Sequence, residues 1–255
     1  MHKLVSVFAL SITGIVICMA MIGVGMSPSG TTPRASQDDN LTINNKTQAF
    51  HIISAVRDGE YVQLTFRNDY PQAINAFTLS GGAHSGVQVD FTHNDNRIAP
   101  GATYNYRVYA ASLEPSGSNE KPLNLTVLDV VFEDGTGDGD ATAIADIQNR
   151  RVGERIALTR IVPLLVQALN SRDSETMDGI ERLKERISLM CESLTRGESG
   201  EVLGGILHGK GYILGDIKQV EEMRAEGRNV NFGDELLKIQ RHYDKKLERL
   251  QKIVR

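Results

Sequence analysis

The sequence predicts an α+β protein with an N-terminal transmembrane or signal segment, an antiparallel β-sandwich of immunoglobulin-like size and a C-terminal helical bundle or helical appendage. Short alternating runs broken by turn residues indicate strands in the first half, and apolar stripes at helical spacing indicate helices in the second. The net charge also changes sign, from −8 over residues 27–149 to +3 over residues 150–255. We therefore expect a β-sandwich domain over 48–140 and a helical domain over 141–255.

The N-terminus is apolar over a length that could cross a membrane. Residues 4–26 form a run of 23 residues without a charge, and about 20 apolar residues are enough to span a bilayer. Residues 1–26 are therefore predicted to be a retained signal-anchor, or a signal peptide that is cleaved near Met26 after the small residues Gly23 and Gly25. We expect the rest of the chain to be membrane-anchored and to face outside the cytoplasm, or to be secreted if the segment is cleaved.

The next segment, 27–47, is rich in Ser, Thr, Pro, Asn and Asp and has no apolar periodicity. Such a composition does not bury enough apolar surface to fold and is typical of linkers. We expect a flexible stalk between the membrane segment and the first domain.

The strands are expected where apolar and polar residues alternate between turn signals. The first two flank Asp58-Gly59, a dipeptide typical of tight hairpins. The chain has no tryptophan, so only the architecture of an immunoglobulin domain is implied. The predicted strand segments are 50–56, 61–66, 73–79, 87–91, 104–109 and 123–132.

The helices are expected where apolar residues recur every three or four positions. In the last of them, Leu236, Tyr243 and Leu250 repeat every seven residues, and Lys246 interrupts this apolar seam. Pro163 is expected to kink or restart the first helix, because proline removes a backbone hydrogen bond. The predicted helical segments are 141–169, 177–194, 211–226 and 236–253.

An acidic, glycine-rich segment at 133–140 suggests a cation site. Calcium prefers several closely spaced carboxylates, and Asp134, Asp138 and Asp140 occupy positions one, five and seven of a calcium loop. Ala145 stands where the pattern requires a bidentate glutamate. The alternative is a loop in which Asp138 or Asp140 caps the following helix. A weak calcium site at Asp134, Asp138 and Asp140 is the metal hypothesis, and no other cofactor is expected.

Nucleotides and nucleic acids are not expected as ligands. The segment 204–211 nearly spells a phosphate-binding loop, but Gly211 follows Lys210 where a magnesium-binding hydroxyl is needed. We expect this segment to be a flexible break between helices. The formal net charge of the whole chain is −4, which gives no electrostatic signal for a nucleic-acid partner.

A hydrolase site could be assembled from the loop region 81–95. His84 and Ser85 with Asp90, or His93 with Asp95, supply the residue types of a nucleophilic triad. No GxSxG motif supports this arrangement. The envelope hydrolase is therefore an alternative hypothesis and not the leading one.

The leading hypothesis is a binding or scaffolding module of a cell envelope that is not an enzyme. It would be held at a membrane through residues 4–26 and would contact a protein partner, or a second copy of itself, through its C-terminal helices. Besides the hydrolase, the second alternative is a structural module stabilised by calcium.

Overall fold

The computed structural model describes residues 41–82, 85–93, 96–113, 123–171, 176–194, 198 and 200–254. These residues belong to one compact unit, Ala35–Arg255. The predicted signal-anchor over 1–26 and the predicted stalk up to residue 40 lie outside the described residues. None of the described helices is both long enough and apolar enough to span a bilayer.

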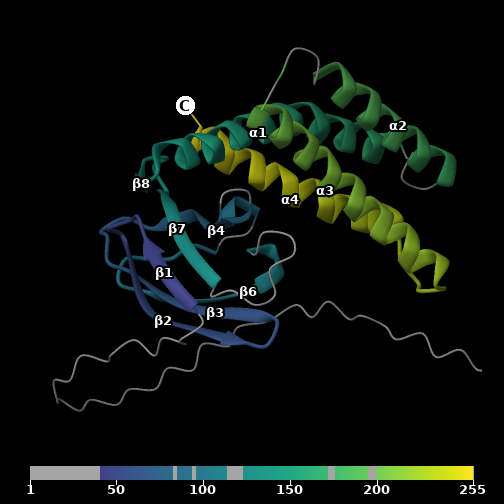
Figure 1. Cartoon of the computed structure of the whole chain (residues 1–255). Coiled ribbons are helices and arrows are strands. Elements are labelled where there is room, and N and C mark those ends of the chain that lie inside the picture. The colour runs from purple at the N-terminus through teal and green to yellow at the C-terminus, as the bar shows by residue number, and fades with distance from the viewer. Residues whose placement is uncertain are drawn as a thin grey trace, which may run out of the picture. The chain divides into compact units, whose positions relative to one another are not determined.

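Strands precede helices along the chain, which confirms the predicted α+β class (Figure 1). The strands in the described residues are β1 (Leu41–Asn45), β2 (Phe50–Asp58), β3 (Tyr61–Asn68), β4 (Ile74–Gly82), β5 (Ser85–Asp90), β6 (Thr103–Tyr109), β7 (Leu123–Phe132) and β8 (Gly137–Gly139). Two short 3₁₀ turns, η1 (Phe91–His93) and η2 (Ala110–Ser112), follow β5 and β6. The helices are α1 (Ala141–Asn170), α2 (Met177–Leu194), α3 (Gly200–Ala225) and α4 (Phe232–Ile253).

The strands form two sheets. One has the order β1-β7-β4-β5 with β8 added beside β7, and the other has the order β2-β3-β6. β1 runs parallel to β7, whereas the other neighbouring strands are antiparallel. The predicted hairpin is confirmed as β2–β3, in which Asp58 pairs with Tyr61 and Gly59 has the positive φ of 58° that this turn uses.

Side chains from both sheets share one apolar core. Val62, Leu64 and Phe66 alternate along β3 and are fully buried, as the period of two predicts. The ring of Phe66 stacks on Phe50 with centroids 4.7 Å apart and meets Phe77 of the other sheet edge-on at 5.7 Å. Aromatic contacts thus join the two sheets.

The C-terminal end of the predicted stalk is a strand, so the prediction of a flexible segment up to residue 47 is wrong there. β1 pairs with β7 along its whole length, with Leu41 opposite Leu123. Leu41 is buried, and Ile43 packs on the shared core. Two apolar residues among polar ones are too short a signal for a strand, and β1 forms because β7 satisfies its backbone hydrogen bonds.

α1 begins where Asp140 caps it. The Asp140 carboxylate accepts hydrogen bonds from the backbone amides of Thr142 and Ala143, so the predicted helix cap is confirmed. The helix continues through Pro163 and does not restart there. Its N-terminal half packs on the sheet, because Ile147 lies in a small cluster with Val131 of β7.

The apolar stripes of the helices meet in a second core. The predicted helix at 177–194 is α2, and the stripe residues Ile180, Leu183 and Ile187 are buried in this core. Tyr243 and Leu250 of α4 lie there as well, as the seven-residue repeat indicates.

The glycine-rich segment 204–211 is helical, so the predicted flexible break is wrong. It lies inside α3, which runs beside α1 (Figure 1). A Cβ on Gly205 would lie 2.0 Å from the carbonyl oxygen of Arg150, and a Cβ on Gly153 would lie 2.0 Å from that of Val202. The glycines are present because the two helix backbones touch, and a side chain at either position would separate them.

This close contact predicts a stability difference between two glycines of one helix. We expect Gly205→Ala to destabilise the protein by about 1–3 kcal/mol or more, because the new methyl group overlaps backbone atoms of α1. Gly211→Ala is the matched control, since no atom lies within 4 Å of its Cβ position, and we expect it to stabilise the helix by up to about 1 kcal/mol. Denaturant unfolding measures both, and equal effects of the two substitutions would contradict the packing argument.

A second prediction concerns the buried carboxyl group of Asp129 on β7. Burial raises the pKa of Asp129 to about 6, although the Thr78 hydroxyl acts in the opposite direction. The folded protein therefore binds a proton more tightly than the unfolded chain, whose aspartates titrate near 3.9, and stability decreases as the pH rises from about 4 to 6.

We expect Asp129→Asn to stabilise the protein by about 1–3 kcal/mol near pH 7.5 and to have little effect near pH 4, because an amide carries no charge at either pH. Asp244→Asn on the exposed face of α4 is the control. Thermal unfolding at the two pH values measures the difference. A gain that is the same at both would rule out the ionisation as its cause.

Candidate functional site

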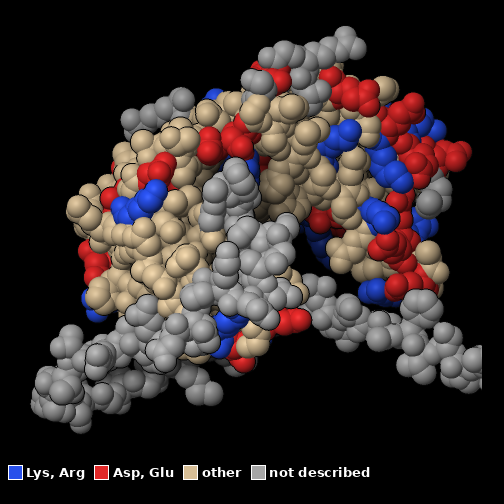
Figure 2. Space-filling view, in the orientation of Figure 1, with Lys and Arg blue, Asp and Glu red and all other residues tan. Residues whose placement is uncertain are grey.

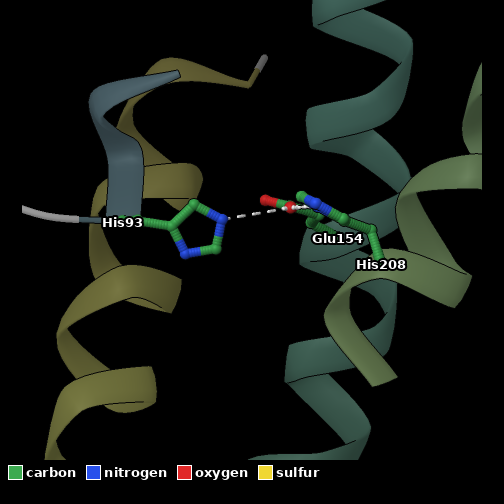
Figure 3. Close-up of side chains that lie close together, drawn as sticks. All are labelled: His93, Glu154 and His208. Atoms are coloured by element: carbon green, nitrogen blue, oxygen red, sulfur yellow. Dashed lines mark hydrogen bonds and ion pairs between the residues drawn. The ribbon is translucent and has the colours of Figure 1, made fainter. Parts of the chain in front are cut away.

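Four ionisable side chains from four separate elements meet beside the end of β5. Nδ1 of His208 lies 2.6 Å from Oε1 of Glu154, and Nε2 of His93 lies 3.8 Å from the same oxygen (Figure 3). Nζ of Lys246 lies 2.9 Å from Oε2 of Glu154. We call this group the junction cluster, and its members are His93 of η1, Glu154 of α1, His208 of α3 and Lys246 of α4.

The charged pair at the centre of the junction cluster is removed from water. The side chains of Glu154 and Lys246 are 4% and 1% exposed. Removing either partner of such a pair leaves the other charge buried without compensation, which typically costs about 3–5 kcal/mol. The pair therefore constrains α1 and α4 to stay close together.

The charges in the junction cluster follow from burial and from neighbours. Burial works to raise the pKa of Glu154, but the hydrogen bond from His208 and the charge of Lys246 hold it below its ordinary value. Burial lowers the pKa of Lys246, and the attraction of Glu154 opposes this effect. Burial and then the charge of Lys246 lower the pKa of His93 to about 4. At neutral pH Glu154 is therefore ionised, and His93 is neutral, so that one of its ring nitrogens is an acceptor for the nearby ammonium group of Lys246.

The two imidazoles form the open side of the junction cluster. The side chains of His93 and His208 are 25% and 40% exposed. The ring of Tyr212, which is 44% exposed, meets His93 edge-on at 4.5 Å and His208 at 4.3 Å between centroids. Solvent thus reaches the imidazoles, whereas the carboxylate and the ammonium lie behind them.

A second buried ion pair adjoins the junction cluster. Nε of Arg151 lies 2.8 Å from Oδ2 of Asp90, and its Nη2 lies 3.1 Å from Oδ1, so the contact is bidentate. The same Nη2 donates to Oδ1 of Asn75 at 2.8 Å. Burial works against ionisation of Asp90, but Arg151 holds the pKa of Asp90 below its ordinary value. This pair fastens the end of β5 to α1.

Helical spacing explains why α1 carries both buried pairs. Arg151 and Glu154 are three residues apart and lie on one side of the helix. His208 reaches Glu154 because Gly209 lets α3 approach, with its Cβ position 3.3 Å from Cβ of Ala157. His93 arrives from the 3₁₀ turn that follows Asp90. The arrangement therefore depends on the glycine contact between α1 and α3.

A pocket of about 340 Å³ opens next to the second ion pair. Asn75 connects the two, because it accepts from Arg151 and also lines the pocket. Arg249 donates to the carbonyl oxygen of Thr92 at the pocket wall. The other lining residues are Phe91, Asn96, Arg97, Glu133, Lys252 and Ile253. The pocket therefore has three cationic side chains and one acidic side chain, which is paired with Arg97.

The three acidic residues predicted as a calcium site do not converge. Asp134 accepts hydrogen bonds from the amide and the hydroxyl group of Thr136 in its own turn. Asp138 accepts from the backbone amides of residues 48 and 49, at 2.6 and 2.8 Å. Asp140 caps α1. Each carboxylate has different hydrogen-bond partners, and the three form no common set of ligands in the described part of the chain.

The residues of the hydrolase alternative that the structure describes have other partners. Asp90 is held by Arg151, and His93 belongs to the junction cluster. His84 and Asp95 lie outside the described residues, as does the side chain of Ser85.

Sequence reasoning did not predict Glu154, His208 or Lys246 as site residues. One signal for Lys246 was present, because a lysine inside an apolar seven-residue seam must be buried with a counter-charge or distort the helix. For His208 the signal was the spacing of Gly205 and Gly209, four residues apart on one helix face. Glu154 carries no local signal, because a glutamate in a long helix is ordinarily exposed.

The junction cluster predicts a non-additive pair of substitutions. We expect Lys246→Met to destabilise the protein by about 3–5 kcal/mol, because the Glu154 carboxylate stays buried without its counter-ion. The double variant Glu154→Met with Lys246→Met should be less destabilised than Lys246→Met alone. Lys245→Met, one position earlier and exposed, is the control and should change stability by less than about 0.5 kcal/mol. Additive effects in denaturant unfolding would show that the two charges do not interact.

No protein-family model, whether of an enzyme family or of any other, matches this sequence. No curated protein and no solved structure matches it either.

Proposed function

We propose that the chain is a membrane-anchored, extracytoplasmic binding module whose ligand site is the junction between the sheets and the helices. The observation that carries the proposal is the junction cluster. Side chains of four elements converge there, and the two imidazoles are open to solvent. The uncharged segment 4–26 supports the membrane anchor, or secretion if that segment is cleaved.

The display domain in this proposal is a β-sandwich of immunoglobulin-like size. Its support is the shared core, in which Phe66 of one sheet meets Phe77 of the other. Two layers that bury their facing side chains against each other are the defining feature of a sandwich. One layer departs from the predicted antiparallel arrangement, because β1 runs parallel to β7. The helical region would then be the second part of the module, attached through α1.

Binding is favoured over catalysis by the partners of the imidazoles. His208 contacts the carboxylate of Glu154, and His93 lies 2.9 Å from the nitrogen of Lys246. A nucleophilic triad instead needs a hydroxyl or thiol group beside the imidazole. Asp90, one of the two acids that the hydrolase alternative could use, is occupied by Arg151. The envelope hydrolase is therefore the weaker of the two functions.

The helices are proposed to contact a partner protein or a second copy of the chain. Leu189 of α2 is 58% exposed and Leu207 of α3 is 50% exposed, so each offers apolar surface to a partner. On the face shown in Figure 2, acidic and basic side chains are interspersed over the helical region. This mixture favours a protein surface as the partner over a polyanion.

Location and contact can be tested together in intact cells. The full-length protein with a C-terminal epitope tag should sediment with membranes, and added protease and a membrane-impermeant crosslinker should both reach it. The variant Leu189→Glu with Leu207→Glu should keep this location and lose the crosslinked species, because two charges now occupy the contact surface. A chain without residues 2–26 is the control and should be protected from both reagents.

A full-length protein that is soluble in the cytoplasm and protected from protease would contradict the proposed location. A crosslinked species that persists unchanged in the leucine variant would contradict the proposed contact surface. Release of a shortened protein into the medium would replace the anchor with a cleaved signal peptide.

A further inference from the structure

We propose that His93, Glu154 and His208 bind a divalent transition-metal ion of the zinc class. The inference deepens the function proposed above by naming its ligand class, and its biological meaning rests on that function. The three residues come from η1, α1 and α3, and one possible ligand atom of each lies within 4.8 Å of the others.

Two of the three distances between ligand atoms are close to those around a bound ion, and the third, between nitrogen atoms of His93 and His208, is no more than 4.8 Å (Figure 3). Zinc binds imidazole nitrogen and carboxylate oxygen at about 2.0–2.2 Å in a tetrahedron, so its ligand atoms lie about 3.4 Å apart. The distances from Oε1 of Glu154 are 2.6 Å to Nδ1 of His208 and 3.8 Å to Nε2 of His93. The distance to His208 must increase and the distance to His93 must decrease, each by less than about 1 Å. Side-chain rotations are sufficient for changes of this size.

The donor set selects the class of metal. Two imidazoles and one carboxylate suit zinc, cobalt, nickel or copper, whereas calcium and magnesium prefer sites made of oxygen ligands. Three protein ligands leave a fourth position for water or for a further ligand. The exposed edges of His93 and His208 give that position access to solvent.

Neighbouring side chains hold the three possible ligands in place. Metal-binding side chains need neighbours that fix their orientation, and these neighbours influence affinity strongly. The ring of Tyr212 packs against both imidazoles. Glu154 is fixed by its place on α1, where Arg151 one turn earlier is anchored to Asp90. Glu154 and His208 are thus held on long helices, and His93 is held at the end of the 3₁₀ turn η1.

Lys246 competes with the metal in this arrangement. Its ammonium lies 2.9 Å from Oε2 of Glu154 and 2.9 Å from Nε2 of His93, so it neutralises the charge that the ion would neutralise. A bound dication must displace the ammonium group of Lys246, or the proton of that group, which then passes to solvent. At His208 the ion takes the place of the hydrogen on Nδ1 that faces Glu154, and the neutral imidazole then carries its proton on Nε2 after exchange with solvent. The site is therefore expected to bind its metal less tightly than the same ligands would without the lysine.

Calorimetric titration of the metal-free full-length protein with Zn²⁺ tests the inference, and absorption of bound Co²⁺ reports the coordination. We expect one site in the wild type. His93→Gln and His208→Gln should each weaken Zn²⁺ binding at least about tenfold, because each removes a ligand. His242→Gln, on α4 and outside the junction cluster, is the matched control and should bind as the wild type does.

Lys246→Met should change the Zn²⁺ affinity in the opposite direction and is therefore the most specific part of the test. Zn²⁺ should bind to this variant more tightly than to the wild type and should raise its melting temperature more, because the competing charge is absent. A merely structural role of the lysine predicts weaker binding in a loosened fold.

Zn²⁺ affinity that is the same in His93→Gln, His208→Gln and the wild type would show an adventitious ion only and would overturn the inference. Weaker binding in a Lys246→Met variant that still unfolds as cooperatively as the wild type would overturn the competition between Lys246 and the metal. If the protein binds no Zn²⁺ but keeps its membrane location and its crosslinked partner, the metal inference is rejected and the proposed function is not. Ligand-specific Zn²⁺ binding by a protein that stays in the cytoplasm would instead reject the proposed location.

Discussion

The buried carboxylate of Glu154 is the constraint on which the junction of sheets and helices depends. A charge that is 96% removed from solvent requires partners of opposite charge or strong donors, or it becomes neutral. Lys246 and His208 supply them from α4 and α3, and the ammonium of Lys246 also contacts His93 at the end of the sheet region. One side chain of α1 thereby fixes the distance of three other elements from that helix.

The glycine contact between α1 and α3 makes this arrangement possible. Gly153 and Gly205 have no side chains to separate the two helix backbones. The helices therefore lie close enough for His208 to contact Glu154 directly. Glycine lowers the intrinsic stability of a helix, so its presence in the middle of α3 indicates that packing compensates for that loss. The same residues that weaken α3 as an isolated helix position its histidine.

The strands and helices could largely be predicted from periodicity, because each has one buried face. The alternation along β3 and the apolar stripe of α2 show this directly, and both elements lie where the patterns place them. β1 could not be predicted, since its two apolar residues form a strand only beside β7. The segment 204–211 is helical although glycine locally disfavours helices, and Gly205 and Gly209 within it contact α1.

By itself the sequence determined the class, the order of strands before helices and a helix cap at Asp138 or Asp140, because these depend on neighbours within a few residues. It also showed that Lys246 lies in an apolar seam. The tertiary structure decided which charges meet. His93, Glu154 and Lys246 are separated by 61 and 92 positions, and no local pattern encodes contacts over such distances. Their proximity follows from the packing of the helices against one another and against the end of β5, which depends on the whole fold.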